Sequence, residues 1–363
     1  MTKLKVGIFL GGKSSEKEIS LESGRHVYNN LDENKYQKIV LFVDDKNQIW
    51  EITEALLWLN TTADIVANLK KEGQRIYFED LKKTIDFAFV AMHGKFAEDA
   101  FPGLFEILNI PNNGAGVLGG ALSMDKEKQR LLLQAAGLNV PKYIAISIES
   151  VILGRREATT PESNKKRFWT SQNDEEKIKK EIGYPCIVKP SREGSSTALA
   201  RPKNEEELNV ALVEAFQYDN TVLVEEVLMG KEVTTAVIGV DEPYALLPTE
   251  TPAKGDFLTA QEKFLPGDAR MITPPNLPKE VIKLIQDSCI KAYKALSLKI
   301  FSRIDGFWTG EKFVILEPNN PPAMTPSTAL WQQVAETNMS AKDFLTMIIE
   351  LAAEAHKNKK GPL

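Results

Sequence analysis

Short apolar runs alternate with amphipathic segments from the first residues of the chain. Strand-like runs occupy residues 5–10, 39–43 and 87–92, and helical patterns separate them. Near-continuous apolar strands separated by helices are typical of a mostly parallel sheet that is covered on both faces. Ligands of such a doubly wound sheet bind beyond the carboxyl ends of its strands, where residues 11–15 and 93–99 lie.

The pattern changes after residue 122, where antiparallel-looking strands mix with helices. Helices are predicted over residues 124–136, 205–216 and 280–295, and strands over residues 143–148, 187–189, 222–226 and 232–240. Residues 150–174 have no apolar period, which predicts an inserted, exposed loop. We therefore expect an α/β protein, α+β in its C-terminal part, with an N-terminal αβ domain (1–122), a central subdomain (123–221) and a C-terminal subdomain (222–363).

Composition narrows the class of protein. A chain of 363 residues exceeds the size that one core serves, and its 43% hydrophobic and 26% charged residues are typical of a folded, soluble protein. The net charge of −5 is mild, so a small-molecule substrate is favoured over a nucleic acid or membrane partner. Cys186 and Cys289 are expected to be buried thiols. The first apolar run is too short for a signal peptide, and no stretch would span a membrane, so we expect a cytoplasmic protein.

Residues Gly7 to Ser14 formally match the phosphate-binding pattern G-x-x-x-x-G-K-[ST]. In a true P-loop the residues between the two glycines form the loop, whereas here residues 8–10 continue an apolar strand. Glu16 follows at the start of a helix, where its charge would repel a triphosphate. We favour a turn that presents Glu16 to a cationic or amino group of a substrate, with a P-loop and a purely structural turn as alternatives.

A second candidate lies where a buried strand delivers Lys189 and then enters a turn that contains Ser195 and Ser196. A buried lysine needs an anionic partner, and phosphate is a common one. The alternative is an edge-strand lysine that reaches solvent. The next strand ends in Glu225 and Glu226. One of these carboxylates could accept ribose hydroxyls, although paired glutamates usually face solvent.

The sharpest constellation is a predicted hairpin that carries Arg303, Asp305, Glu317 and Asn319. Two carboxylates and an amide oxygen make an all-oxygen site of the kind that Mg²⁺ prefers when phosphate oxygens complete its shell. Arg303 would neutralise a transferring phosphoryl group or an oxyanion. The alternative is a surface hairpin with cross-strand ion pairs. His93 follows a buried strand and suits either a cleft or a buried structural position.

These motifs, taken in order, resemble the D-alanine–D-alanine ligase family over nearly the whole chain. The matching stretches are residues 10–24, 92–94 with 98–99, 124–126, 188–196, 223–226 with 230–232, and the 303/305 and 317/319 pairs. The resemblance implies an ATP-grasp fold with ATP held between the central and C-terminal subdomains. It also implies a cytoplasmic ligase that forms D-alanyl-D-alanine through an acyl phosphate for peptidoglycan synthesis. It further implies ATP and two Mg²⁺ ions (or Mn²⁺) as cofactors, and a homodimer as the assembly.

The resemblance also implies roles for individual residues. In the nucleotide site, the residues expected to bind phosphates are Lys126, Lys189 and Ser195, and those expected to contact adenosine are Glu225, Glu226, Leu228 and Glu232. The expected magnesium ligands are Asp305, Glu317 and Asn319. In the substrate site, the residues expected to contact the first substrate are Glu16, Ser196 and His93, and those expected to contact the second are Lys263, Phe264 and Thr328. Arg303 and the backbone N–H of Ala323 are expected to stabilise the oxyanion.

This sequence departs from the family pattern mainly at substrate contacts. Phe264 stands where the family has a tyrosine, which resembles ligases that accept D-lactate as the second substrate. Ala323 and Thr328 replace a glycine and a serine, and Thr197-Ala198 replaces valine-glycine. A ligase with a different second substrate, such as D-lactate, is therefore one alternative. A nucleotide-binding pseudoenzyme is another, although the complete set of metal ligands argues against it.

Overall fold

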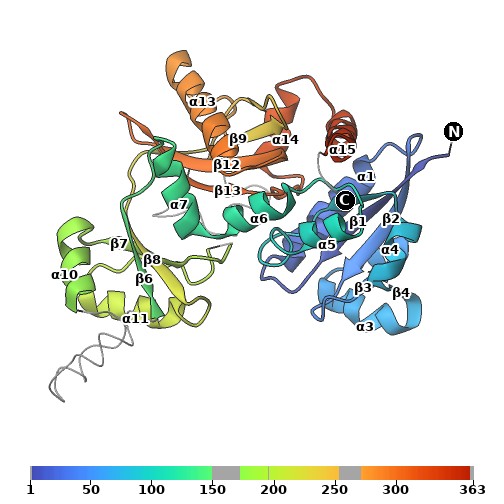
Figure 1. The fold of residues 1–363 in the computed structure, drawn as a ribbon, viewed down its shortest axis with the longest axis horizontal. Coiled ribbons are helices and arrows are strands. Elements are labelled where there is room, and N and C mark those ends of the chain that lie inside the picture. Colours follow the sequence, from blue (N-terminus) through green and yellow to red (C-terminus); the bar gives the residue numbers. More distant parts are fainter. Residues whose placement is uncertain (1, 149–171, 195, 253–270, 360–363) are drawn as a thin grey trace.

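The computed structural model describes residues 2–148, 172–194, 196–252 and 271–359, which form three lobes, each built on one sheet (Figure 1). Within these ranges no helix is both long and apolar enough to cross a membrane. Cys186 and Cys289 are buried free thiols, as predicted.

The N-terminal lobe contains a five-stranded sheet in the order β4-β3-β2-β1-β5. Its central strands are parallel, as predicted, because β1 pairs in parallel with both β2 and β5. The expectation of a mostly parallel sheet is wrong at one edge, where β3 and β4 are antiparallel. Each has only three residues, too few to produce a readable period in the sequence. The strands are β1 (Leu4–Gly11), β2 (Tyr36–Val43), β3 (Ile49–Glu51), β4 (Gln74–Ile76) and β5 (Phe87–Val90).

Both faces of this sheet are covered. Ile8 and Phe9, neighbours on β1, point to opposite faces and belong to two different apolar clusters. Phe9 meets Phe105 edge to face, with 4.9 Å between ring centroids. The helices of this lobe are α1 (Lys17–Asn30), α2 (Glu54–Leu57), α3 (Thr62–Glu72), the 3₁₀ turn η1 (Phe78–Asp80), α4 (Leu81–Thr84) and α5 (Phe101–Ile107).

The second lobe is a three-stranded antiparallel sheet in the order β6-β8-β7. It contains β6 (Tyr143–Ser147), β7 (Cys186–Pro190), β8 (Thr221–Glu226), α10 (Gln172–Glu181) and α11 (Glu205–Ala215). Since β8 pairs with both neighbours, the predicted start of a new subdomain at residue 222 does not fit, and we place the boundary after Glu226. Residues 172–174 of the predicted inserted loop belong to α10, and the loop's remainder lies outside the described residues.

The C-terminal sheet has the order β10-β9-β12-β13, with β11 paired to β9. The predicted hairpin is present: β12 and β13 are antiparallel, and Arg303 lies opposite Asn319 while Asp305 lies opposite Glu317. A register shift follows Asp305. The elements are β9 (Lys231–Gly239), β10 (Tyr244–Ala245), β11 (Thr249–Glu250), α13 (Lys279–Ala295), β12 (Ile300–Trp308), β13 (Phe313–Asn319), α14 (Ala329–Ala335) and α15 (Ala341–Lys357).

Two earlier helices pack against the C-terminal sheet rather than the central one. The predicted helix over 124–136 is α7 (Lys126–Ala135), which begins after its N-cap Asp125. The helix before it, α6 (Gly116–Met124), was not predicted, and the two helices meet at Asp125, whose side chain caps α7. Leu133 of α7 lies in the same apolar cluster as Tyr293 of α13. The stretch 123–140 therefore packs with the C-terminal lobe, although the sequence pattern predicts it within the central subdomain.

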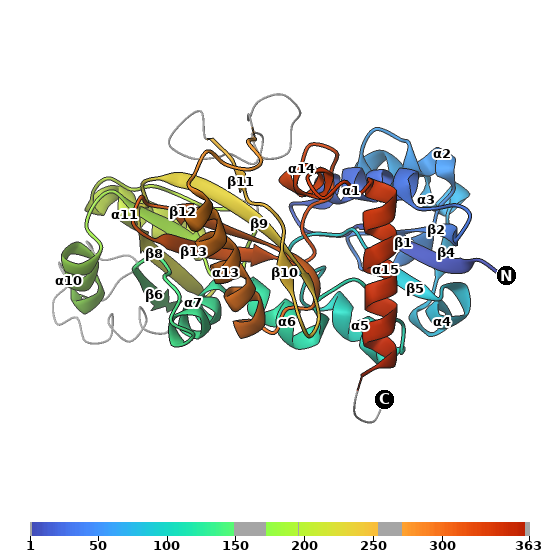
Figure 2. The ribbon, with the colours of Figure 1, turned by 90° about the horizontal axis from the view of Figure 1, so that it is seen from above.

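The last helix returns to the N-terminal lobe (Figure 2). A capping box between Ser340 and Asp343 starts α15. Its Phe344 lies in one apolar cluster with Val6 of β1 and Phe301 of β12. The N-terminal and C-terminal lobes thus share a core, which fixes the loops of one lobe against the hairpin of the other.

Candidate active site

A cavity of about 500 Å³ opens between the three-stranded sheet and the C-terminal sheet. We call it the nucleotide cavity, after the ligand that the family resemblance predicts for several of its lining residues. It is lined by cationic, acidic and apolar side chains from both sheets and from the segment between β8 and β9. Predicted site residues in its lining are Lys126, Lys189, Ser196, Glu225, Glu226, Leu228, Glu232 and Glu317.

Asp305 is the centre of the polar contacts on the β12–β13 hairpin. Arg303 holds both of its oxygens, through Nε to Oδ1 and Nη2 to Oδ2, each at 3.0 Å. Asn319 Nδ2 donates to Oδ2 at 3.1 Å. Thr234 of β9, which the sequence reading missed, donates its hydroxyl to Oδ1 at 2.5 Å. Period-two spacing and strand pairing therefore bring the predicted hairpin residues together.

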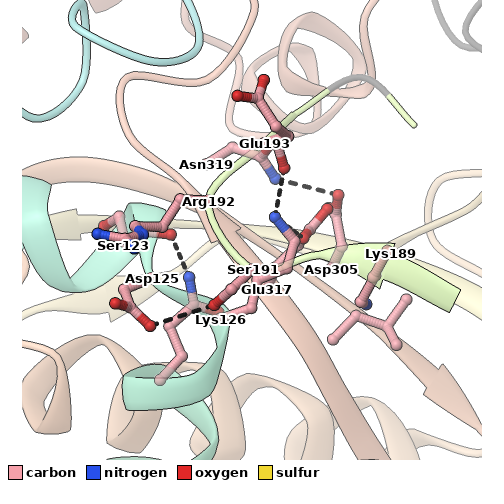
Figure 3. A network of polar contacts seen from close by, with 12 residues as sticks. Ser123, Asp125, Lys126, Lys189, Ser191, Arg192, Glu193, Asp305, Glu317 and Asn319 are labelled. Atoms are coloured by element: carbon pink, nitrogen blue, oxygen red, sulfur yellow. Dashed lines mark hydrogen bonds and ion pairs between the residues drawn. The ribbon is translucent and has the colours of Figure 1, made fainter. Parts of the chain in front are cut away.

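Lys126, at the start of α7, reaches into the same region. Its Nζ lies 3.2 Å from Glu317 Oε2 and donates to the backbone carbonyl of Glu193 at 2.6 Å. Figure 3 shows Lys126, Glu193, Glu317, Asp305 and Asn319 gathered from separate segments of the chain. The lysine ammonium is buried and bridges the hairpin to the segment that follows β7.

A buried ion triad supports the wall of the nucleotide cavity: Lys189 and Glu225 line the cavity, and Arg130 lies behind them. Glu225 Oε2 lies 2.8 Å from Lys189 Nζ, and Glu225 Oε1 lies 2.8 Å from Arg130 Nη2. Burial, partly offset by Glu225, lowers the pKa of Lys189. Burial would raise the pKa of Glu225, but Arg130 and Lys189 outweigh it and lower that pKa. Glu225 lines the cavity, and both of its oxygens contact cations. The ribose contact that the sequence suggests for Glu225 or Glu226 stays a prediction.

Arg130 is not among the site residues predicted from the sequence. The available signal was helical spacing, since Arg130 follows Lys126 by four residues and shares its face of α7. Lys189 is buried and paired, so the alternative of a lysine that reaches solvent is wrong. Glu226 contacts the strand edge instead, where its Oε1 accepts from the backbone N–H of Lys142 at 2.8 Å.

A second cluster, which we call the N-terminal corner, contains Glu16, Ser23, His93, Gly94 and Glu98. His93 is buried, and its Nε2 lies 2.9 Å from Ser23 Oγ. Burial lowers the pKa of His93 to about 4. An oxygen of the Glu98 carboxyl group accepts from the backbone N–H of Gly94 at 2.9 Å. Burial, with a further contribution from the negative charge of Glu16, raises the pKa of Glu98 to about 8.

The corner connects to the C-terminal lobe through backbone N–H groups. Glu98 Oε2 accepts from Asn320 N at 3.0 Å, and Ser23 Oγ accepts from Met324 N at 3.1 Å. The predicted oxyanion residue Ala323 lies within this buried segment. These contacts hold the loop after β13 against the predicted substrate-binding histidine.

Glu16 lies between two glycines from distant loops. A Cβ atom on Gly94 would lie 2.7 Å from Glu16 Oε2, and one on Gly194 would lie 3.3 Å from Oε1. Gly94 also has a φ of +78°, which disfavours other residues. The carboxylate is thus held between the N-terminal lobe and the turn that carries Ser196, which itself has a positive φ of 60°.

Of the remaining predicted site residues, the structure describes Thr328 and leaves three others outside the described ranges. Thr328 is buried at the start of α14 and donates its hydroxyl to the carbonyl of Thr325 at 3.0 Å. Ser195, Lys263 and Phe264 lie outside the described residues. The P-loop alternative is wrong, because β1 extends through the residues that would have to form the loop.

Two models of known protein families match this chain. The model described as D-ala D-ala ligase N-terminus matches residues 5–115, and the one described as D-ala D-ala ligase C-terminus matches residues 132–350. The chain belongs to the D-alanine–D-alanine ligase family. It therefore has the ATP-grasp fold and is an ATP-dependent ligase, in a family whose role is peptidoglycan precursor synthesis.

Curated relatives and solved structures agree with this assignment. The D-alanine–D-alanine ligase of Geobacillus thermodenitrificans is 31% identical over 99% of this chain and 98% of its own length. The one from Lactobacillus gasseri is 33% identical over 99% and 97%. The Coxiella burnetii ligase structure has a TM-score of 0.78 and 27% identity, covering 98% of this chain and 96% of its own. The VanG D-Ala:D-Ser ligase of Enterococcus faecalis has the same TM-score and identity, covering 97% and 100%.

The hairpin of this D-alanine–D-alanine ligase family member has the donor chemistry for magnesium. Among the described residues, no group of three or more His, Cys, Asp or Glu side chains could hold a metal ion. The predicted set instead offers two carboxylates and one amide, so phosphate oxygens and water would have to complete a magnesium shell. Both carboxylates are held by cations, Asp305 by Arg303 and Glu317 by Lys126. An anionic ligand could draw those cations away and release oxygens for a metal.

Proposed function

We propose that this ligase joins two molecules of D-alanine, converting ATP to ADP and phosphate, and that the nucleotide cavity and the N-terminal corner are the two ends of its active site. The observation that carries the proposal is that Lys126 and Lys189 line one cavity between two sheets, where Lys126 pairs with Glu317 of the acidic hairpin. The same hairpin holds the Arg303–Asp305 ion pair. Paired cations and carboxylates of this kind suit a polyphosphate that arrives with a divalent cation.

In the first step, a carboxylate oxygen of the first D-alanine attacks the γ-phosphorus of ATP. The bond from that phosphorus to the β-bridging oxygen breaks, which yields an acyl phosphate and ADP. Lys126 and Lys189 would orient and neutralise phosphate oxygens, since positioning and charge neutralisation are the main contributions to phosphoryl transfer. Glu16 would bind the ammonium group of this first substrate, with Ser196 supporting the carboxylate.

In the second step, the neutral amine of the second D-alanine attacks the carbonyl carbon of the acyl phosphate. The tetrahedral intermediate places negative charge on the former carbonyl oxygen, which Arg303 and the backbone N–H of Ala323 would stabilise. Phosphate then leaves as the carbonyl group re-forms to give the amide, and the proton that the nitrogen loses passes to the departing phosphate. His93 would position the first substrate, and Lys263, Phe264 and Thr328 would contact the second.

Asp305, Glu317 and Asn319 are the residues that would hold magnesium. Bound Mg²⁺ would neutralise and orient the phosphate oxygens of ATP. The all-oxygen donor set supports this assignment, and Mn²⁺ has a compatible preference for oxygen ligands.

The test of the product uses purified protein, Mg-ATP and D-alanine, with phosphate release and product mass as readouts. We expect release with D-alanine alone and a dipeptide product, and no release with L-alanine. Matched reactions contain D-lactate or D-serine together with D-alanine. Phosphate release that needs D-lactate or D-serine would contradict the proposed product. ATP binding without release in any mixture would indicate a pseudoenzyme.

A different second substrate is the second candidate. It is supported by Phe264 in place of the family tyrosine and by the structural likeness to a D-Ala:D-Ser ligase. The same reactions separate the two candidates, because the dipeptide, the depsipeptide with D-lactate and the dipeptide with D-serine differ in mass.

The location and assembly of the protein are further parts of the proposal. Dependence on ATP supports a cytoplasmic location, and the family resemblance supports a homodimer formed through the N-terminal domain. Light scattering on the purified protein would give its mass in solution, and a monomer mass would contradict the dimer.

A further inference from the structure

Arg130 is the largest fully buried side chain of the described residues, and no role in the proposed reaction accounts for it. It lies on α7 and donates to one oxygen of Glu225, from Nε at 3.2 Å and from Nη2 at 2.8 Å. Its remaining nitrogen, Nη1, donates to the backbone carbonyl of Leu316 on β13. One guanidinium thus connects a helix, the three-stranded sheet and the magnesium hairpin.

The carboxylate that Arg130 holds is shared with Lys189. Glu225 Oε2 lies 2.8 Å from Lys189 Nζ, while Oε1 takes both Arg130 contacts. Each of the three residues is at least nine-tenths buried. Two cations on a single carboxylate leave an excess positive charge in a low-dielectric wall, which is costly unless an anion lies close by. Lys189 lines the nucleotide cavity, so that anion can approach from there.

The geometry needs a guanidinium rather than any cation. The planar fork of arginine sends donors in fixed directions, here toward a carboxylate on β8 and a carbonyl on β13. Lysine could hold Glu225 or Leu316 but could not fix the relative position of the two strands in the same way. Since Glu225 then orients Lys189, the position of the Lys189 ammonium depends on Arg130.

We propose that Arg130 is a positioning residue, which acts through Glu225 to place the Lys189 ammonium against the phosphates of the nucleotide. This inference rests on the proposed phosphate-binding role of Lys189. It assigns to Arg130 an effect on nucleotide affinity, even though Arg130 itself contacts protein atoms in the wall of the cavity.

The test is a double-mutant cycle in nucleotide affinity on the full-length protein. The probe is adenylyl imidodiphosphate, a non-hydrolysable ATP analogue, with Mg²⁺, measured by calorimetry. The variants are Arg130→Met, Lys189→Met and the double variant. We expect Arg130→Met to weaken binding by about tenfold to a hundredfold in the wild-type background, the effect of losing a hydrogen bond to a charged group. In the Lys189→Met background the same change should have little effect.

Two further variants separate positioning from general stability. Arg130→Lys should restore part of the affinity, and it replaces Arg130→Met in the cycle if the methionine variant does not fold. Arg192→Met is the matched control, because Arg192 also pairs with a carboxylate, Asp219 at 3.1 Å, but does not line the cavity. Its affinity should equal that of wild type. The KM for D-alanine should also stay close to the wild-type value in the Arg130 variants.

The results of the cycle show separately whether the role of Arg130 and the phosphate-binding role of Lys189 are correct. Equal losses of affinity from Arg130→Met in both backgrounds would overturn the inference alone, because Arg130 would then act independently of Lys189. An unchanged affinity in Lys189→Met would overturn both the inference and the proposed role of Lys189.

Discussion

The nucleotide cavity and the N-terminal corner stabilise buried charge in different ways. In the cavity, carboxylates pair with cations, as Glu225 does with Arg130 and Lys189. In the corner, the Glu98 carboxyl is held by two backbone N–H groups, and its pKa is raised to about 8, chiefly by burial. The first arrangement keeps permanent charges in place, and the second favours neutral forms of the buried groups.

This difference matches the two substrates we propose. A polyphosphate needs fixed positive charge, which ion pairs can hold in a low-dielectric wall until the ligand arrives. A small amino acid needs one carboxylate for its ammonium, and a neutral His93 and a neutral Glu98 leave that role to Glu16. Variants in the nucleotide cavity and in the N-terminal corner therefore test this difference between ion-paired and neutral buried groups.

The largest effect is expected at the hairpin. Glu317→Gln should reduce turnover at least about a thousandfold, or about 4 kcal/mol of transition-state stabilisation, because a neutral amide cannot replace a magnesium-binding carboxylate. The measurement is the rate of phosphate release with D-alanine and saturating Mg-ATP. Glu311→Gln, in the exposed turn of the same hairpin, is the control and should keep wild-type turnover. Near-normal turnover of Glu317→Gln would mean that the metal site lies elsewhere.

The hairpin is predictable from the sequence because its chemistry follows strand periodicity. Residues two apart on a strand share a face, so the spacing alone places Arg303 and Asp305 together. Arg130 and Thr234 are not predictable in that way. Each contacts a residue far away in the sequence, Glu225 and Asp305, and only the packing of α7 and β9 brings those partners within reach.

Lobe boundaries and the corner are harder to predict for a related reason. An apolar strand begins after residue 221 and suggests a boundary there, but the pairing of β8 with β6 and β7 decides its lobe. The corner depends on loops: Gly94 and Gly194 approach Glu16 from segments about a hundred residues apart in the sequence. Sequence spacing carries no record of such approaches, so only a family resemblance could suggest them.

An intermediate effect is expected at His93. Its pKa is 6.5 in the unfolded chain and about 4 when folded, so between these values the unfolded state holds the extra proton. Stability should therefore fall as pH decreases through this range, by about 2 kcal/mol between pH 7 and pH 5 from this group alone. Denaturant unfolding at several pH values would measure it, and His93→Gln should show a smaller fall over that interval.

A second histidine provides the control for this measurement. His356 on α15 is only partly buried, and its Nε2 lies 2.7 Å from Asn109 Oδ1. His356→Gln should change the pH dependence of unfolding less than His93→Gln does. Parallel curves for wild type and His93→Gln would show that His93 titrates normally in the folded protein, and the contrast between cavity and corner would then rest on Glu98 alone.

The smallest effect is expected at Lys13, whose sequence context imitates a P-loop. Lys13 is exposed, and its ammonium lies over the ring of Phe96, 3.4 Å from the centroid. Lys13→Ala should therefore leave affinity for the ATP analogue within about twofold of wild type and cost about 0.5–1 kcal/mol of stability from the lost cation–π contact. Lys189→Met, measured in parallel, should lose affinity strongly. If the two variants lost affinity equally, phosphate recognition would involve the N-terminal lobe, and the division of the site into a charged nucleotide end and a neutral substrate end would fail.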